Sequence, residues 1–316
     1  MPLLKLIPDN TNIDFLRYRF VGVGFTLVLI VASIFLLATR GLNYGVDFAG
    51  GLMIEAGFKE NISLDELRGT VNRLQVGEAS LQEFGGPKNI SIRLPLPPGN
   101  ETAVQQVVVK VQKAIAQNHP DVTFRRVETV SGKVSQELIK DGALAAVIAM
   151  VAVAFYIWVR FEWQFGVGAL FALFHDVTIT LGFFSLTQLE FNLNIVAAVL
   201  TIIGYSLNDT IVVYDRVREN LRKYRKMDMQ TLLNLSVNET LARTMVTSLS
   251  MILALGALLI WGGDVLFGFS AAMFLGILIG TYSSVYVAAP LLIWLGVGPD
   301  SFVEQEEKAA AEKAKP

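Results

Sequence analysis

Long runs without a charged residue alternate along the chain with short polar segments. Four runs carry no charge at all, over residues 20–39, 142–159, 244–263 and 265–299. Two further runs, 163–189 and 191–214, are interrupted only at His175, Asp176 and Asp209. Since about 20 apolar residues cross a bilayer as a helix, the pattern predicts six transmembrane helices.

Residues 40–137 follow a different pattern, with apolar positions that repeat at strand and helix periods. Alternation predicts strands at 50–58, 79–84, 90–94 and 122–130. Helical spacing predicts helices at 63–75, opened by a capping box from Ser63 to Glu66, and at 101–118. The order is the βαββαβ order of a ferredoxin-like fold. We therefore expect a polytopic α-helical membrane protein with a periplasmic α+β domain after helix 1.

Basic residues gather on one side of this layout. Both termini and the loops at 160–164 and 215–243 hold 14 Lys and Arg, whereas the two short opposite loops hold none. Basic segments stay in the cytoplasm, which places the α+β domain, 40–137, outside. Residues 1–19 are then a cytoplasmic N-terminus, and the first span, 20–39, is a retained anchor because it is too long for a signal peptide.

The same layout places helices 2–6 within residues 138–299. The basic, amphipathic segment 215–243 is predicted to form one or two cytoplasmic helices at the lipid headgroups. The tail at 300–316 is rich in Ala, Glu and Lys, and we expect it to be cytoplasmic and disordered.

The composition of the chain excludes several classes of function. Hydrophobic residues make up 53% of the chain and charged residues 17%, and the net charge of -2 gives no reason to expect a nucleic-acid partner. The chain has no cysteine and only two histidines, which excludes thiolate chemistry and most metal clusters. Walker, G-x-S-x-G and HExxH motifs are absent from the sequence. We expect no bond-making catalysis, no cofactor and no metal.

Asp209 is the first candidate for chemistry. A charged side chain inside a span costs about 2.5–3.5 kcal/mol, so its presence calls for a reason. A partly buried carboxylate whose cation partner moves can load and release a proton. Arg243 enters the next span from the same side, and we expect it to be that cation. The structural alternatives are that Asp209 caps backbone and that Arg243 snorkels to phosphates.

His175 and Asp176 lie nearest the middle of their own span, so depth alone favours them as a proton relay. Adjacent helical side chains point about 100° apart. We therefore expect no hydrogen bond between the two and look for partners on neighbouring helices. No third ligand of matching depth accompanies them, which argues against a metal site.

Small residues predict close packing and a hinge. Gly276 and Gly280 form a small-xxx-small pattern in the last span. Further glycines that we assign to packing or hinge roles are Gly41, Gly45, Gly50 and Gly51 after the first span and Gly204 in the fourth.

Several sequence blocks resemble the bacterial SecD/SecF family of protein-export membrane proteins, on its SecF side. They are Gly45-Val-Asp-Phe-Ala-Gly-Gly51, Phe174-His-Asp-Val177, Gly204-Tyr-Ser-Leu-Asn-Asp-Thr210 with Asp215-Arg-Val-Arg-Glu-Asn220, and Gly280-Thr-Tyr-Ser-Ser-Val-Tyr286. The blocks occur in the family's order on a six-span layout, and the resemblance covers nearly the whole chain.

The resemblance implies an inner-membrane accessory subunit of the Sec translocase, related to resistance-nodulation-division transporters. It implies a SecD-like partner and action with SecYEG, with YajC and YidC as further candidate partners. The proton-motive force would help to draw unfolded preprotein out on the periplasmic side, with protons as the coupling ion. The family's proton-carrying Asp falls on Asp209 and its charged partner on Arg243, which ranks Asp209 above Asp176.

Two other functions stay open from the sequence. One is a proton-coupled small-molecule exporter of the same superfamily, and the other is a scaffold subunit that only stabilises its partner.

Overall fold

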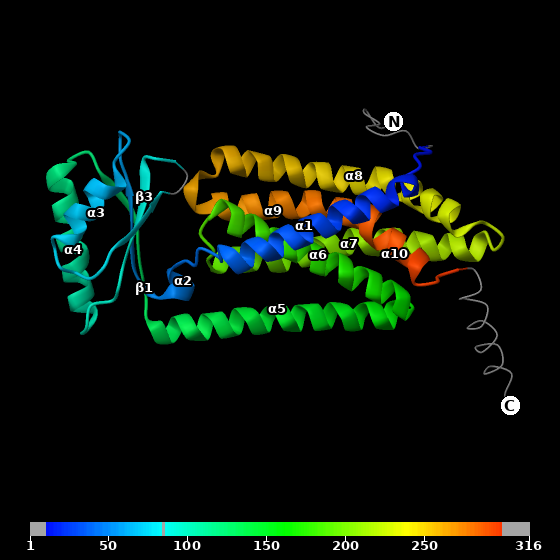
Figure 1. Ribbon diagram of the computed structural model, residues 1–316, viewed down its shortest axis with the longest axis horizontal. Coiled ribbons are helices and arrows are strands. Elements are labelled where there is room, and N and C mark those ends of the chain that lie inside the picture. Colours follow the sequence, from blue (N-terminus) through cyan, green and yellow to red (C-terminus); the bar gives the residue numbers. More distant parts are fainter. Residues whose placement is uncertain (1–10, 84–85, 299–316) are drawn as a thin grey trace.

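The chain forms an elongated bundle of long helices with a small sheet domain at one end (Figure 1). The computed structural model describes residues 11–83 and 86–298, so the predicted tail at 300–316 lies outside the described residues. We call the end of the bundle beside the sheet domain the domain end, and the opposite end the far end.

Six helices in the described part of the chain are long and apolar enough to cross a membrane, which confirms the predicted spans. They are α1 (Arg19–Thr39), preceded by the 3-10 turn η1 (Leu16–Tyr18), α5 (Gly132–Arg160), α6 (Trp163–Thr187), α7 (Leu193–Lys223), α8 (Met229–Trp261) and α9 (Gly263–Ser283). The last of these continues through a π-helical turn, η2 (Ser284–Ala288), into α10 (Ala289–Trp294).

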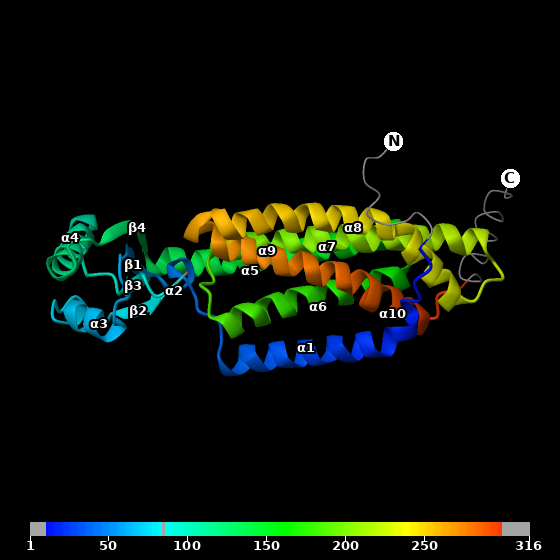
Figure 2. The ribbon, with the colours of Figure 1, turned by 90° about the horizontal axis from the view of Figure 1, so that it is seen from above.

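Helices α6 and α7 form the centre of the bundle. In the most apolar stretch of α6, 61% of the residues are buried, against 6% in α5. Figure 2 shows α1 and α8 on opposite sides of the bundle, with α6 and α9 between them. Polar side chains on α6 and α7 are therefore surrounded by protein on most sides. The free-energy cost of burying them must be offset by hydrogen-bond partners within the bundle.

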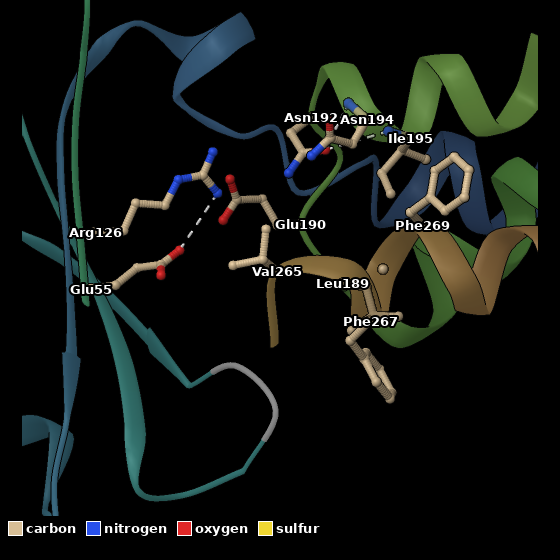
Figure 3. A pocket seen from close by; sticks show the side chains of 11 residues that line it. Glu55, Arg126, Leu189, Glu190, Asn192, Asn194, Ile195, Val265, Phe267 and Phe269 are labelled. Atoms are coloured by element: carbon tan, nitrogen blue, oxygen red, sulfur yellow. Dashed lines mark hydrogen bonds and ion pairs between the residues drawn. The ribbon is translucent and has the colours of Figure 1, made fainter. Parts of the chain in front are cut away.

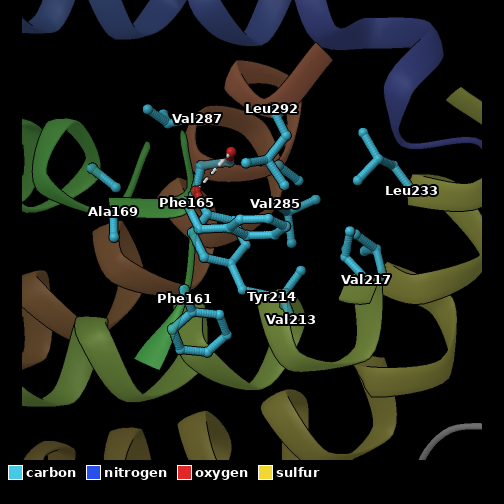
Figure 4. Close-up of a cluster of buried hydrophobic side chains, with 14 of the residues drawn as sticks. Phe161, Phe165, Ala169, Val213, Tyr214, Val217, Leu233, Val285, Val287 and Leu292 are labelled. Atoms are coloured by element: carbon cyan, nitrogen blue, oxygen red, sulfur yellow. Dashed lines mark hydrogen bonds between the residues drawn. The ribbon is translucent and has the colours of Figure 1, made fainter. Parts of the chain in front are cut away.

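The basic segment 215–243 consists of extensions of two membrane helices. It is helical, as predicted, but its two helices are not separate elements, because α7 and α8 both continue beyond the apolar runs and meet at a turn over residues 224–228. Apolar residues hold the two extensions together, namely Val217, Leu221, Leu232, Leu233 and Val237. Their core continues into the cluster around Phe161, Phe165 and Tyr214 (Figure 4), where the Tyr214 hydroxyl donates to the Ala288 carbonyl at 3.0 Å. This apolar stripe explains why the extensions pack on each other.

The sheet domain has the predicted βαββαβ order, which confirms the ferredoxin-like fold. Its elements are β1 (Gly51–Gly57), α3 (Leu64–Asn72), β2 (Ser80–Glu83), β3 (Asn89–Leu94), α4 (Glu101–Asn118) and β4 (Thr123–Val130). The strands form one antiparallel sheet in the order β2-β3-β1-β4. Helices α3 and α4 cover the face turned away from the bundle (Figure 1). The other face therefore looks toward the membrane helices.

One local prediction needs correction, and one short helix was not predicted. Ser63 occupies the N-cap of α3, but its side chain accepts no capping hydrogen bond, and the helix ends at Asn72 before Gln75. The glycine block after the first span contains a short helix that the sequence did not predict, α2 (Val46–Ala49). Gly50 and Gly51 follow it with φ of 70° and 116°, a left-handed backbone that favours glycine, so they turn α2 sharply into β1.

Candidate functional site

The middle of α6 carries two fully buried ionisable side chains, His175 and Asp176, each with 0% of its surface exposed. The two are hydrogen-bonded, with 2.7 Å between His175 Nδ1 and Asp176 Oδ1. Our expectation that they would not bond is therefore wrong. The angle of about 100° describes where the two side chains leave the helix, whereas their torsions bring the ring nitrogen and the carboxylate back together.

Asp176 also has partners on neighbouring helices, as expected. Its Oδ2 accepts hydrogen bonds from the hydroxyls of Ser206 on α7 and of Ser283, the last residue of α9; the Ser283 bond is 2.9 Å long. We call Asp176, His175, Ser206 and Ser283 the Asp176 cluster. Because its bonds join three helices at one carboxylate, the cluster holds α6, α7 and α9 in one arrangement.

The other side of His175 faces Tyr282. The two rings lie 6.1 Å apart, and the Tyr282 hydroxyl donates to the Gly22 carbonyl of α1 at 2.7 Å. His175 Nε2 is buried and has no hydrogen-bond partner among the residues described. The ring therefore lies between the carboxylate of Asp176 and the contact of α9 with α1.

Asp209 lies on α7, three residues after Ser206 and thus on nearly the same face of the helix. It is 2% exposed, and its Oδ2 has no hydrogen-bond partner within residues 11–83 and 86–298. Asp209 is therefore buried beside the Asp176 cluster but does not share its hydrogen bonds. An unpaired charge at such a place is costly.

The structure does not join Asp209 to Arg243. The two residues do not differ in depth. The hydrogen bond between Tyr205 on α7 and Ser248 on α8 marks one level in the bundle. Asp209 lies four residues after Tyr205, and Arg243 lies five residues before Ser248 on a helix that runs in the opposite direction. Both are thus about 6–8 Å toward the far end. The difference is in rotation, because α8 buries Thr244 and Ser248 and turns Arg243 outward, exposed. Arg243 has no ion pair in the described part of the chain.

A second set of polar contacts links α7, α8 and α9. The Tyr205 hydroxyl donates to Ser248 at 3.3 Å, and Ser248 shares a hydrogen bond of 2.7 Å with Thr281. Sequence reasoning missed this set. The available signal was hydroxyl residues spaced along one face of spans that carry no charge.

Close contact between α7 and α9 surrounds these polar groups. A methyl group added at Gly276 would lie 2.5 Å from Ile202, and one added at Gly280 would lie 3.1 Å from Ser206. At Gly204 it would meet no atom within 4 Å, so packing gives no reason for glycine there. The π-helical turn η2 begins directly after Ser283. Such turns are frequent at functional sites, and the sequence gave no sign of this one.

A polar junction connects the sheet domain to the domain end of the bundle. Arg93 on β3 forms an ion pair with Glu190, which lies between α6 and α7, at 3.1 Å. In a small cavity of about 70 Å³ beside it (Figure 3), Arg126 pairs with Glu55 while Glu190 points toward Arg126 from the opposite wall. Burial raises the pKa of Glu128, which also pairs with Arg126.

Gly45 allows this close approach. A methyl group there would lie 2.5 Å from Glu190 Oε1. Within the described residues, no group of three or more His, Cys, Asp and Glu side chains is arranged to hold a metal ion.

Comparison with known families gives two matches. The family described as "Protein export membrane protein SecD/SecF, C-terminal" matches residues 110–298, and "SecD/SecF GG Motif" matches residues 35–62. The second match contains Gly45, Gly50 and Gly51, and the first contains the Asp176 cluster, Asp209 and Arg243.

Curated relatives are similar over nearly their whole length. Protein translocase subunit SecF of Rickettsia rickettsii is 42% identical over 290 residues, which are 92% of this chain and 94% of that protein. Protein translocase subunit SecF of Ketogulonicigenium vulgare is 44% identical over 310 residues, 94% of this chain and 93% of that protein.

Solved structures of SecDF are similar as well. The crystal structure of SecDF, a translocon-associated membrane protein from Thermus thermophilus, matches 92% of this chain with a TM-score of 0.84 and 33% identity. SecDF in a super-membrane-facing form matches 99% of it with a TM-score of 0.67 and 32% identity. The chain spans 39% and 41% of those two SecDF chains.

Proposed function

Since the chain belongs to the SecD/SecF family of protein-export membrane proteins and is an accessory subunit of the Sec translocase, we propose that it uses the proton-motive force. In this proposal, proton movement through the membrane helices promotes preprotein translocation and release on the periplasmic side. The subunit makes and breaks no covalent bond and needs no cofactor other than protons.

The observation that carries the proposal is the state of Asp209. Its carboxylate is buried, and one oxygen has no partner in the part of the chain described. Protonation removes the cost of an unpaired buried charge, and a cation brought to the carboxylate offsets it. The two charge states of Asp209 therefore favour two different arrangements of the helices around it.

Arg243 is the cation proposed to meet Asp209 in the charged state. The two residues lie at similar depth on α7 and α8, and the outward rotation of α8 keeps them apart here. A turn of α8 about its axis, or a shift of α7, would bring the guanidinium toward the carboxylate. One charge that crosses 100 mV supplies about 2.3 kcal/mol. That energy changes the populations of two arrangements more than tenfold.

The Asp176 cluster has a different role in this proposal. Three partners hold Asp176, and protonation of this carboxylate would weaken the hydrogen bonds that join α6, α7 and α9. We assign Asp176 and His175 to holding these helices in register and Asp209 to carrying the proton.

The subunit has a SecD-type partner in this family, as the SecDF neighbours imply. We propose further that both termini are cytoplasmic, that the sheet domain is periplasmic in the bacterial inner membrane, and that SecYEG, YajC and YidC act with the pair. The lack of Lys and Arg in the two short loops at the domain end supports this orientation.

The test is preprotein export in vesicles that hold the full chain with its SecD-type partner, SecYEG and SecA. An Asp209→Asn variant that inserts normally should keep export driven by ATP alone and lose the increment added by a proton gradient. Thr201→Val is a matched control, because Thr201 is exposed on the same helix and bonds only to its own helix backbone. Proton-dependent export that is undiminished in Asp209→Asn would refute the assignment.

The same vesicles separate the alternatives. A small-molecule exporter would release solute without preprotein release. A scaffold would tolerate neutralisation of Asp176 and Asp209 together.

A further inference from the structure

A cavity of about 480 Å³ lies at the far end of the bundle, between the end of α5 and the extension of α7. We propose that it binds the headgroup of an anionic phospholipid, and we call it the far-end cavity. The residues that line it are Arg160, Asp215, Arg218, Glu219, Arg222 and Lys223. Four of these six are basic. The inference does not depend on the use of a proton gradient.

The far-end cavity lies at the level of the membrane surface. Arg160 and Asp215 directly follow the apolar runs of α5 and α7. Trp158 and Trp163, on either side of Arg160 in the sequence, are exposed. Tryptophan is enriched at membrane–water interfaces, where its ring lies among the headgroups. The basic groups of the cavity are therefore at the depth of lipid phosphates.

The fold holds two of the arginines in place. The guanidinium carbons of Arg160 and Arg218 lie 5.1 and 5.0 Å from the centre of the Phe161 ring. Arg218 Nη1 also donates to the Arg160 carbonyl at 3.0 Å. Arg222 follows Arg218 by four residues and so lies on the same face of α7. The planar guanidinium matches the oxygens of a phosphate, and these groups are already oriented before a ligand arrives.

The carboxylates near the cavity leave part of its positive charge unbalanced. Asp215 pairs with Arg160 at 3.0 Å. Glu162 Oε2 lies 3.5 Å from Arg218 Nε, but neither atom has a hydrogen-bond partner among the residues described. Glu219 binds an arginine outside the cavity. Because the basic lining residues outnumber the acidic ones, an anion in the cavity is favoured.

An exposed strip on α5 leads from the bilayer to the cavity. Ile148, Ala152 and Tyr156 are exposed and precede Arg160 at intervals of four residues, so all four lie on one face of the helix. Helix α5 lies at the edge of the bundle (Figure 1), and only 6% of its most apolar stretch is buried. A lipid whose headgroup is in the cavity has room for its acyl chains along this strip. A free phosphate or an acidic peptide has no such chain to place there.

The charge of the cavity selects among phospholipids. Basic groups at the membrane surface attract lipids of net negative charge. A zwitterionic headgroup carries its own cation, which the surplus of basic side chains repels. We therefore expect phosphatidylglycerol to bind in preference to phosphatidylcholine.

The chain's own tryptophans report on the cavity. Trp261→Phe with Trp294→Phe leaves Trp158 and Trp163 beside it, whereas a chain that keeps only Trp261 has an exposed reporter at the domain end. Each full-length chain is placed in phosphatidylcholine nanodiscs with a small share of phosphatidylglycerol or phosphatidylcholine that carries brominated acyl chains. Brominated phosphatidylglycerol should quench Trp158 and Trp163 several-fold more than brominated phosphatidylcholine does, and Trp261 should show no such preference.

Charge variants test the assignment to the cavity. Arg160→Gln with Arg222→Gln should remove the preference for the anionic lipid. The matched control is Arg225→Gln with Lys226→Gln, which removes the same charge from exposed positions beyond the cavity and should keep the preference. Thermal unfolding of both double variants checks that they fold like the parent.

Three results would overturn the inference. Equal quenching of Trp158 and Trp163 by the two lipids would refute it. An equal loss of preference in both double variants would reduce it to general attraction between a basic surface and acidic lipid. Loss of the preference in inorganic phosphate, but not in chloride of equal ionic strength, would assign the cavity to free phosphate. A preference that appears only after removal of residues 300–316 would assign it to the chain's own tail.

Discussion

Two carboxylates lie buried on adjacent helices of this bundle, and their surroundings are opposite. Asp176 has His175, Ser206 and Ser283 as partners on three elements, whereas one oxygen of Asp209 has no partner in the described chain. Burial alone therefore does not distinguish a structural acid from a proton carrier. The proposed difference in role rests on the number of donors, because protonation costs more at a carboxylate whose hydrogen bonds are satisfied than at one that has an unpaired oxygen.

The largest effect on stability should come from Asp176→Ala. The change leaves the two serine hydroxyls and the His175 ring without their shared acceptor in a buried place, and we expect a loss of about 3–5 kcal/mol. Thermal unfolding in detergent measures it. Thr178→Ala on the same helix is the control, and equal melting of Asp176→Ala and the parent chain would contradict the structural role of Asp176.

The next largest effect on stability should come from the packing of α7 against α9. Gly276→Ala forces a methyl group against Ile202 and should destabilise the chain by about 1–3 kcal/mol. In Gly204→Ala, on α7, the added methyl group has no atom within 4 Å. Because alanine has a higher helix propensity than glycine, this change should stabilise the folded chain by up to about 1 kcal/mol. Melting of the two variants side by side would show whether the α7–α9 contact, which positions Ser206 against Asp176, is as close as described.

Asp209→Asn should change stability much less than Asp176→Ala, by about 1 kcal/mol or less in either direction, because no hydrogen bond to Oδ2 is lost. The same melting experiment checks it. A loss as large as that of Asp176→Ala would mean that Asp209 has partners in the folded chain, and the contrast between the two carboxylates would disappear.

The smallest effect is expected at Glu128 in the junction. Burial raises the pKa of this carboxyl, so its ionised form is disfavoured in the folded chain, and the penalty is present above the usual pKa range of Glu and absent well below it. Glu128→Gln should therefore raise the melting temperature slightly at pH 7 and leave it unchanged near pH 3. A gain that grows toward low pH would contradict this sign.

Sequence patterns predicted the large features for clear physical reasons. Apolar runs of about 20 residues with few or no charges predict the six spans, and alternation of apolar residues predicts the four strands of the sheet domain. The burial of Asp209 and Asp176 followed from the same runs. These features depend on local periodicity, which a single sequence contains.

The contacts of the site depend on the rotation of each helix about its own axis and on side-chain torsion angles. The periodicity of apolar residues in the sequence determines neither. The bond between His175 and Asp176 arises from side-chain torsions, and the separation of Arg243 from Asp209 arises from the rotation of α8 about its axis. The junction of Asp47 and Arg93 with the loop before α7 joins positions about 100–150 residues apart. No local sequence pattern predicts these contacts.

Proton flow coupled to preprotein release tests the central claim most directly. Vesicles that hold the full subunit with its SecD-type partner, SecYEG and SecA export preprotein into their lumen, which corresponds to the periplasmic side. They would be loaded with a pH indicator and compared with the same vesicles carrying Asp209→Asn. We expect protons to leave the lumen during preprotein release in the parent and not in Asp209→Asn, although Asp209→Asn still inserts and melts close to the parent. Equal export-coupled proton flow in both would contradict the role of Asp209.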